Sequence, residues 1–199
     1  MNHERDLPPA RRAAPTFLAV LALCSLGACR APGPPPEGRG REWLSVFVAS
    51  VDRRGSDADQ VDDSGALALE GGYDVIEFWR MRGALEIGAV WSRHDVPMVQ
   101  GTDEDPKLSV VRYSLGGRAA LDLAPLNAVL YVNGGVYVRD EESNDEPAFE
   151  QNGRGAYIGG GLDFWYDATG RMGPFVRAYD FADSDLNEVL VGIAATFSL

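Results

Sequence analysis

Apolar and polar residues alternate with a period of two over most of the chain from Glu42 onward. Residues 108–123 show the pattern clearly, because one set of alternate positions is apolar or small and the other carries the charge. The first set is Val111, Tyr113, Leu115, Gly117, Ala119, Leu121 and Leu123, and the second is Arg112, Ser114, Gly116, Arg118, Ala120 and Asp122. A strand places such sets on opposite faces, whereas a helix would mix them. The pattern therefore predicts β-strands.

Eight segments follow this pattern: 42–53, 64–75, 81–94, 108–123, 126–139, 155–166, 173–182 and 187–199. In the seventh segment the pattern leaves open whether Val176 or Arg177 faces outward. Residues 76–80 break the alternation, which favours a turn between the second and third segments. A continuous strand over 64–82 is the competing interpretation.

The connections between segments alternate in length. Those near 76–80, 124–125 and 167–172 are short and contain Pro125 and Gly170, which suit turns. The connections at 54–63, 95–107 and 140–154 are longer and acidic, with Asp57, Asp59, Asp62, Asp63, Asp103, Glu104, Asp105, Asp140, Glu141, Glu142, Asp145, Glu146 and Glu150. In an up-and-down meander this alternation gathers the short turns at one end and the long loops at the other, which is typical of outer-membrane barrels.

The composition of the two faces indicates which one meets lipid. The polar face carries glycines and isolated charges of both signs, which suits the filled interior of a narrow closed sheet. These charges are Glu70, Asp74, Glu86, Arg112, Arg118, Asp122, Arg139 and Asp163, and the glycines that leave room for large neighbours are Gly88, Gly116, Gly135, Gly159 and Gly161. The predicted fold is all-β, an eight-stranded antiparallel up-and-down transmembrane β-barrel. Its expected aromatic girdle residues are Trp43, Trp91, Tyr113, Phe164, Tyr166 and Phe197.

Composition narrows the classes of function. The net charge of −12 excludes a basic surface of the kind that binds nucleic acid. The only cysteines are Cys24 and Cys29 and the only histidines are His3 and His94, so neither a disulfide framework nor a His-rich zinc site is expected. No apolar run beyond the N-terminus is long enough for a membrane-spanning helix.

The first 28 residues have the layout of a bacterial export signal. Arg5, Arg11 and Arg12 precede an apolar run over 13–26 that is too short to span a bilayer as a helix. The sequence Leu26-Gly27-Ala28-Cys29 resembles a lipobox, in which the cysteine thiol carries a diacylglycerol. Ordinary cleavage near Ala28 is the alternative. The expected organisation is a signal peptide (1–28), a lipidated Cys29 with a Pro- and Gly-rich tether (29–41), and a barrel domain (42–199).

From 42 to 199 the chain resembles the small, porin-like outer-membrane β-barrel families. The best local match is Val191-x-Ile193-x-Ala195-x-Phe197-x-Leu199, which is similar to the terminal strand signal of such barrels. The resemblance implies the barrel-assembly machinery as a partner of the last strand, and outer-membrane lipid and lipopolysaccharide as surroundings. A monomer in the outer membrane is expected.

One enzyme family with this strand plan, the lipid A deacylases, deserves comparison. Their seventh strand carries an Arg-x-Tyr-x-His-x-Ser-Asn-like stretch, in which the histidine is the base for the serine nucleophile. The corresponding residues here, Arg177-Ala178-Tyr179-Asp180-Phe181-Ala182-Asp183-Ser184, contain no histidine. A serine without a nearby base is a poor nucleophile, so hydrolase activity is not expected, and it stays the second alternative.

Other candidate sites have simpler explanations. Two acidic groups have oxygen ligands that suit Ca²⁺ or Mg²⁺, Asp57-x-Asp59-x-x-Asp62-Asp63 and Glu141-Glu142. We nevertheless expect them to belong to solvated loops. His94 is expected at the outer rim without a serine or cysteine neighbour. Gly159-Gly160-Gly161 lacks the context of a phosphate loop and indicates close strand packing.

The expected function is therefore that of a non-catalytic outer-membrane β-barrel lipoprotein, with a structural or surface-interaction role through its acidic loops. Lipidation at Cys29 is the one expected site, with no catalytic residue, cofactor or metal. The first alternative is a lipocalin-like periplasmic lipoprotein that binds a small apolar ligand. A lipocalin would have its apolar face inward and its charges outward, so the orientation of Val111, Leu115, Leu130 and Val132 distinguishes the two.

Overall fold

The described residues form a single closed β-barrel. The computed structural model describes residues 41–54, 64–95, 107–143, 153–181 and 187–199. The strands are β1 (Glu42–Arg54), β2 (Ser64–Phe78), β3 (Met81–Asp95), β4 (Lys107–Leu123), β5 (Ala128–Ser143), β6 (Gly153–Trp165), β7 (Gly170–Phe181) and β8 (Asn187–Ser198), with a short 3-10 helix, η2 (Ala124–Leu126), between β4 and β5. Within the described residues, no helix is long and apolar enough to cross a membrane.

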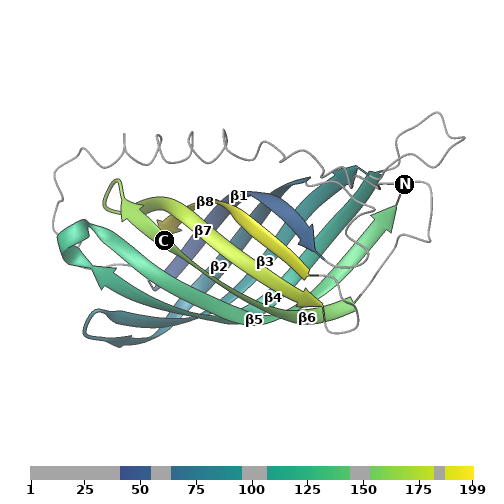
Figure 1. The fold of residues 1–199 in the computed structure, drawn as a ribbon. Helices are drawn as coiled ribbons and strands as arrows, with labels where there is room; N and C mark the ends of the chain where they lie inside the picture. The colour runs from purple at the N-terminus through teal and green to yellow at the C-terminus, as the bar shows by residue number, and fades with distance from the viewer. Residues whose placement is uncertain (1–40, 55–63, 96–106, 144–152, 182–186) are drawn as a thin grey trace, which may run out of the picture.

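Each strand pairs antiparallel with the next, and β8 pairs with β1 to close the ring. At the closing seam the backbone N–H of Leu199 donates to the carbonyl oxygen of Glu42 at 2.9 Å. Figure 1 shows the tilted strands side by side, with the short turns and the C-terminus gathered at the left end. The predicted eight-stranded antiparallel up-and-down barrel is confirmed. A closed sheet leaves no open strand edges along the ring, which is the arrangement that lipid requires.

The break in alternation after residue 75 has a different cause from the expected one. The turn between β2 and β3 is only Trp79–Arg80, and β2 continues to Phe78. The pairing register shifts between Asp74 and Ile76, so a β-bulge accounts for the irregularity. The predicted turn therefore lies within 76–80 but is shorter than expected, and the competing continuous strand over 64–82 is wrong because the chain reverses at Trp79–Arg80.

The other short turns are closed by local hydrogen bonds. Between β6 and β7 the Asp167 carboxylate accepts from the backbone N–H groups of Thr169 at 2.8 Å and Gly170 at 2.6 Å. After η2, Asn127 adopts the left-handed conformation with φ 48, which an asparagine tolerates well. These turns let neighbouring strands reverse direction within a few residues.

The two faces of the sheet are arranged as the alternation predicts. On β4, Leu115 is 59% exposed, whereas its neighbours of opposite parity, such as Arg112 and Arg118, are buried. Val111, Leu130 and Val132 also lie on the outer face, so the predicted orientation is confirmed. On β7, where the pattern left two choices, Val176 is outside and Arg177 is buried inside.

Large aromatic side chains fill the interior beside glycines. Phe47 and Phe175 meet edge to face with ring centroids 4.8 Å apart, and Tyr137 and Tyr179 do so at 4.9 Å. A Cβ at Gly161 would lie 2.7 Å from the Tyr131 hydroxyl oxygen, so only glycine leaves room for that ring. Close contacts with bulky interior side chains also occur at the other predicted positions, Gly88, Gly116, Gly135 and Gly159.

We expect Gly116→Ala to destabilise the barrel by about 1–3 kcal/mol, the usual cost of overpacking a filled interior. An added Cβ at Gly116 would overlap the Tyr157 hydroxyl and the Gly134 carbonyl oxygen. The free energy of unfolding in detergent, followed by heat-modifiable gel mobility, measures the effect. Gly65→Ala is the matched control, because a Cβ at Gly65 meets nothing within 4 Å. Equal stability of the two variants would contradict the filled interior.

Candidate functional site: the charged interior and the apolar outer wall

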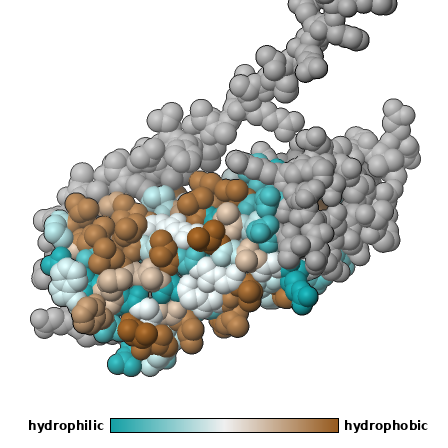
Figure 2. All heavy atoms as spheres, turned by 60° about the horizontal axis from the view of Figure 1, so that its bottom comes forward, coloured by the Kyte–Doolittle hydropathy of each residue, from teal (hydrophilic) through white to brown (hydrophobic). Residues whose placement is uncertain are grey.

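The outer wall of the barrel is formed by exposed apolar side chains. Several apolar side chains on the neighbouring strands β3, β4 and β5 are each 59–65% exposed. They are Leu85, Ile87, Leu115, Val132 and Val136. Figure 2 shows brown, hydrophobic residues gathered on the face that it presents, interrupted by white and by fewer teal residues. An exposed apolar surface of this extent marks a contact with another apolar phase or partner.

The interior, in contrast, holds charged side chains in pairs. Among the described residues, inward ion pairs join the arginines Arg53, Arg82, Arg112, Arg118, Arg139, Arg171 and Arg177 to the carboxylates Glu70, Asp74, Asp122, Glu141, Asp163 and Glu188. Glu86, a further buried carboxylate, is held by neutral donors. Unpaired charges would be very costly in this water-poor space.

The largest group of charges lies toward the end of the barrel with the long connections. Glu188 on β8 accepts from Arg112 Nε at 2.6 Å and lies 2.9 Å from Arg53 Nε. Arg53 Nη2 also contacts Glu141 at 3.0 Å, and Arg139 is within ion-pair distance of both Glu141 and Glu188. Four strands, β1, β4, β5 and β8, are thereby joined across the lumen. This arginine–glutamate cluster holds those strands together at that end of the interior.

Two carboxylates occupy the middle of the barrel. Glu70 forms a two-point ion pair with Arg177, including an Nη2–Oε2 distance of 3.0 Å. Glu86 accepts a hydrogen bond from the Tyr157 hydroxyl at 2.6 Å and another from Asn133 Nδ2 at 2.8 Å. These bonds connect β2 to β7, and β3 to β5 and β6, so they hold strands that are not neighbours in the sheet.

Toward the short-turn end, two arginines share one carboxylate. Arg118 Nη2 lies 3.3 Å and Arg171 Nε 3.1 Å from the same Asp163 oxygen. The Arg118 guanidinium also lies over the Tyr131 ring, 3.6 Å from its centroid, and 4.8 Å from that of Trp43. Cation–π contacts of this kind add stabilisation when the cation is desolvated.

Five of the six predicted girdle residues lie on the outer face, and Trp43 does not. Trp91, Tyr113, Tyr166 and Phe197 are 38–53% exposed, and Phe164 has the outward parity of β6. Trp43 is only 4% exposed, because its parity on β1 is that of the interior and its ring packs beside Arg118. A position near a strand end therefore does not suffice to place an aromatic residue in a girdle.

His94 is not the isolated rim residue that the sequence predicts. It is fully buried, and its Nε2 lies 3.0 Å from Ser92 Oγ and 3.3 Å from Ser64 Oγ. Arg112 Nη1 in turn donates to Ser92 Oγ at 3.0 Å. The expectation that His94 lacks a serine neighbour is wrong, because strand pairing brings Ser64 on β2 beside His94 on β3. The serines, His94 and Arg112 join the arginine–glutamate cluster as one polar network.

The described part of the stretch that was compared with the deacylases forms contacts inside the barrel. Arg177 and Tyr179 both point inward, 3.3 Å apart between Nη1 and the hydroxyl oxygen, and Arg177 pairs with Glu70. Asp183 and Ser184 lie outside the described residues. Neither inward side chain is therefore available to act on a lipid outside the barrel.

Other predicted sites fall partly outside the described residues. Cys29 and most of the acidic loop residues belong to this group, so their roles stay predictions. Glu141 is an exception, because β5 extends to Ser143 and the Glu141 side chain is buried against Arg53 and Arg139. The part of the chain with described coordinates contains no group of three or more His, Cys, Asp or Glu side chains that could hold a metal ion.

Sequence reasoning did not assign several interior partners, including Arg53, Arg82, Arg171 and Glu188. Each lies at or near a strand end, where the alternation is short or joins a turn. Extending the period of two by two residues beyond the seventh segment would have placed Arg171 on the inner face, and Glu188 shares the parity of Leu190 within the eighth segment. Their pairing across the lumen depends on barrel geometry and is not contained in the pattern of one strand.

No known family model matches the sequence, and no curated protein does. Solved barrels do match the structure. Neisserial surface protein A aligns with a TM-score of 0.57 and 12% identity over 82% of this chain and 100% of that one. The outer membrane protein OprG from Pseudomonas aeruginosa aligns with a TM-score of 0.54 and 14% identity, over 81% and 98%. Ail, the attachment invasion locus protein of Yersinia pestis, solved with the heparin analogue sucrose octasulfate, gives 0.53 and 14%, over 80% and 99%.

These comparisons define the fold class of the chain as a closed, eight-stranded, small outer-membrane-type β-barrel. At such low identity the similarity concerns the fold alone.

We expect Glu188→Gln to destabilise the barrel by about 3–5 kcal/mol, the usual cost of removing one partner from a buried ion pair. The loss would leave Arg112, Arg53 and Arg139 with less compensating charge. Unfolding in denaturant, measured in detergent or vesicles, gives the free energy. Glu77→Gln, at an exposed position on β2, is the control. Adding Arg112→Met to Glu188→Gln should recover part of the loss, and additive losses would contradict coupling between the two residues.

Proposed function

We propose that this protein is a non-catalytic outer-membrane β-barrel lipoprotein, with a structural or surface-interaction role through its acidic outer loops. The observation that carries the proposal is the polarity of the closed sheet, with apolar side chains outside and paired charges inside. A barrel in water must bury its apolar side chains inside and expose its charges. A barrel in lipid must instead satisfy its polar groups internally.

The asymmetry of the two ends supports an orientation in the membrane. The short turns lie at the end where β1 begins and β8 finishes, and the long connections lie at the other. In outer-membrane barrels short turns face the periplasm and long loops face outward. The acidic residues of the long connections would then face the cell exterior, where loops commonly carry binding.

The position of the first strand supports a lipid anchor on the same side as the short turns. β1 begins at Glu42, so residues 30–41 lead from Cys29 to the periplasmic end in this orientation. A diacylglycerol on Cys29 would enter the periplasmic leaflet, whose surface lies at that end. An anchor and a barrel can therefore occupy the same membrane without the chain crossing it again.

The lipocalin-like alternative has less support. A lipocalin holds an apolar ligand in a barrel lined by apolar side chains. In this barrel the inward positions are occupied by ion-paired arginines and carboxylates and by rings such as Phe47, Tyr131 and Tyr179. The apolar residues that such a ligand would need, including Leu115 and Val132, face outward.

The hydrolase alternative has one observation in its favour, the contact between Ser64 and His94. Against it, His94 is completely buried inside the barrel, where a lipid outside the wall does not reach it. Its Nε2 is also shared with Ser92, whose hydroxyl accepts from Arg112. We therefore assign the two serines and His94 a structural role.

Leu115→Arg should impair membrane insertion, because arginine on the lipid face near the bilayer centre costs about 2–4 kcal/mol. Leu115 lies at the middle of β4 and is 59% exposed. Outer-membrane fractionation combined with heat-modifiable gel mobility measures insertion. The matched control is Ser109→Arg, on the same face of β4 but near the long-loop end. A Leu115→Arg protein that stays folded and water-soluble would overturn the proposal.

Expression of the protein should leave lipid A fully acylated. Mass spectrometry of lipid A from cells with and without the protein measures this, with a His94→Ala variant as a second comparison. Loss of an acyl chain that requires His94 would refute the non-catalytic assignment and restore the hydrolase alternative.

A further inference from the structure

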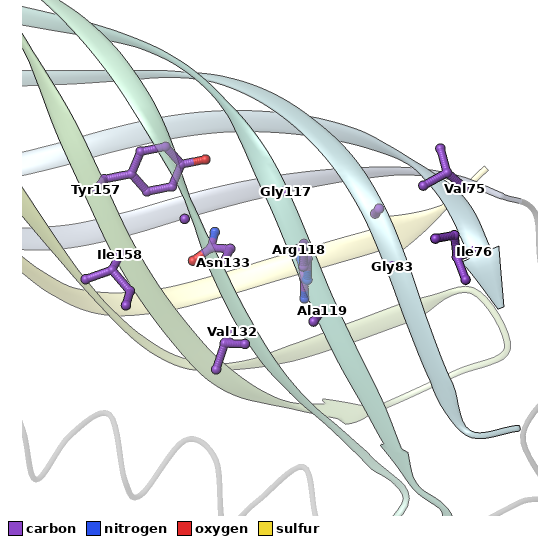
Figure 3. A pocket seen from close by; sticks show the side chains of 12 residues that line it. Val75, Ile76, Gly83, Gly117, Arg118, Ala119, Val132, Asn133, Tyr157 and Ile158 are labelled. Atoms are coloured by element: carbon purple, nitrogen blue, oxygen red, sulfur yellow. The ribbon is translucent and has the colours of Figure 1, made fainter. Parts of the chain in front are cut away.

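A shallow groove crosses the outer wall from β2 to β6. Its volume is about 590 Å³. Small residues, Gly117, Ala119 and Gly134, form its floor, and Ile76, Val132 and Ile158 are among the apolar side chains along it. Figure 3 shows the groove residues that it labels on successive strands, with Val75 and Ile76 at one end and Ile158 at the other.

The hollow follows from the register of the strands. Gly117 on β4 is directly opposite Gly134 on β5, so two neighbouring outward positions lack side chains. The polar residues that border the same region, Arg118, Asn133 and Tyr157, are buried and bonded inside the barrel. The surface offered by the groove is therefore apolar, which suits a hydrocarbon chain.

One end of the groove adjoins the point where the N-terminal segment joins the barrel. The backbone N–H of Asp74 donates to the carbonyl oxygen of Arg41 at 2.8 Å, immediately before the groove residues Val75 and Ile76. Twelve residues, 30–41, separate Cys29 from β1 and include four prolines. At about 3.1 Å per residue for an extended Pro-rich segment, they reach roughly 37 Å. Cys29 is therefore within reach of the whole groove.

We propose that the groove holds a fatty acyl chain of the protein's own lipid anchor on Cys29. The inference rests on the lipoprotein part of the proposed function. A short tether keeps its lipid near the barrel and raises the local concentration of that chain beside the groove. An acyl chain along the floor supplies the dispersion contacts that the missing side chains of Gly117 and Gly134 leave open. The acyl chain of the anchor is then held at a defined position on the barrel wall.

Photocrosslinking of the full-length lipoprotein tests this directly. Cells are fed a fatty acid with a photoreactive group and an alkyne handle, and the purified protein is irradiated in its native membrane fraction. Mass spectrometry of its peptides should place most of the crosslinks from the Cys29 lipid at residues 75–76, 117–119, 132–134 and 158. A Gly117→Leu variant, which fills the floor, should lose most of that label. A Cβ at Gly117 meets only the Ala84 carbonyl oxygen, at 3.5 Å, so the variant has room to fold.

The matched control is Ala89→Leu, which also introduces a leucine side chain on the outer face, on β3 away from the groove, and should keep the wild-type pattern. Crosslinks spread evenly around the wall, or directed mainly to a second copy of the chain, would overturn the inference while leaving the proposed function intact. Equal groove labelling by a photoreactive phospholipid added to the purified protein would also overturn it, because the occupant would then be free lipid. A mature protein with no lipid on Cys29 would reject both this inference and the lipoprotein assignment, and fractionation would still report on the barrel.

Discussion

The requirement that each buried charge be compensated inside a closed sheet governs the arrangement of this protein. Neither the filled interior nor an apolar phase outside offers water to a guanidinium or a carboxylate. The solution is a series of cross-lumen contacts, from Glu188 among three arginines at one end to Asp163 between Arg118 and Arg171 at the other. These contacts join strands that are distant in sequence, and they leave the outer face free to be largely apolar.

The faces of the strands were predictable from the sequence because the period of two is a property of the strand alone. Leu115 and Arg118 fall on opposite sides whatever else the chain does. The interior glycines were predictable for a related reason, since a narrow barrel must alternate small and large residues to be filled. On β7 the alternation is weak, because Gly173 and Pro174 precede Val176 and Arg177. The pattern there did not decide which of the two side chains faces inward.

Contacts across the lumen were not predictable, because they depend on register and on the stagger of the closed ring. The packing of Trp43 against Arg118 is of this kind, and the contact of Ser64 with His94 on the neighbouring strand likewise depends on the register. A one-residue change of register would move each of these side chains to the other face. The similarity to Neisserial surface protein A at 12% identity leads to the same conclusion, since the alternation is compatible with many different interior partners.

The seam between β1 and β8 has a consequence for how the molecule is made. It joins Trp43 to Ser198 and Arg54 to Asn187, so the first and last strands must meet before the ring exists. Until then the chain is an open sheet with two unsatisfied edges, which are prone to pair with other chains. Contacts between residues so far apart in sequence also form slowly. Biogenesis of this barrel therefore includes an interval in which its first strand must be protected while its last strand arrives.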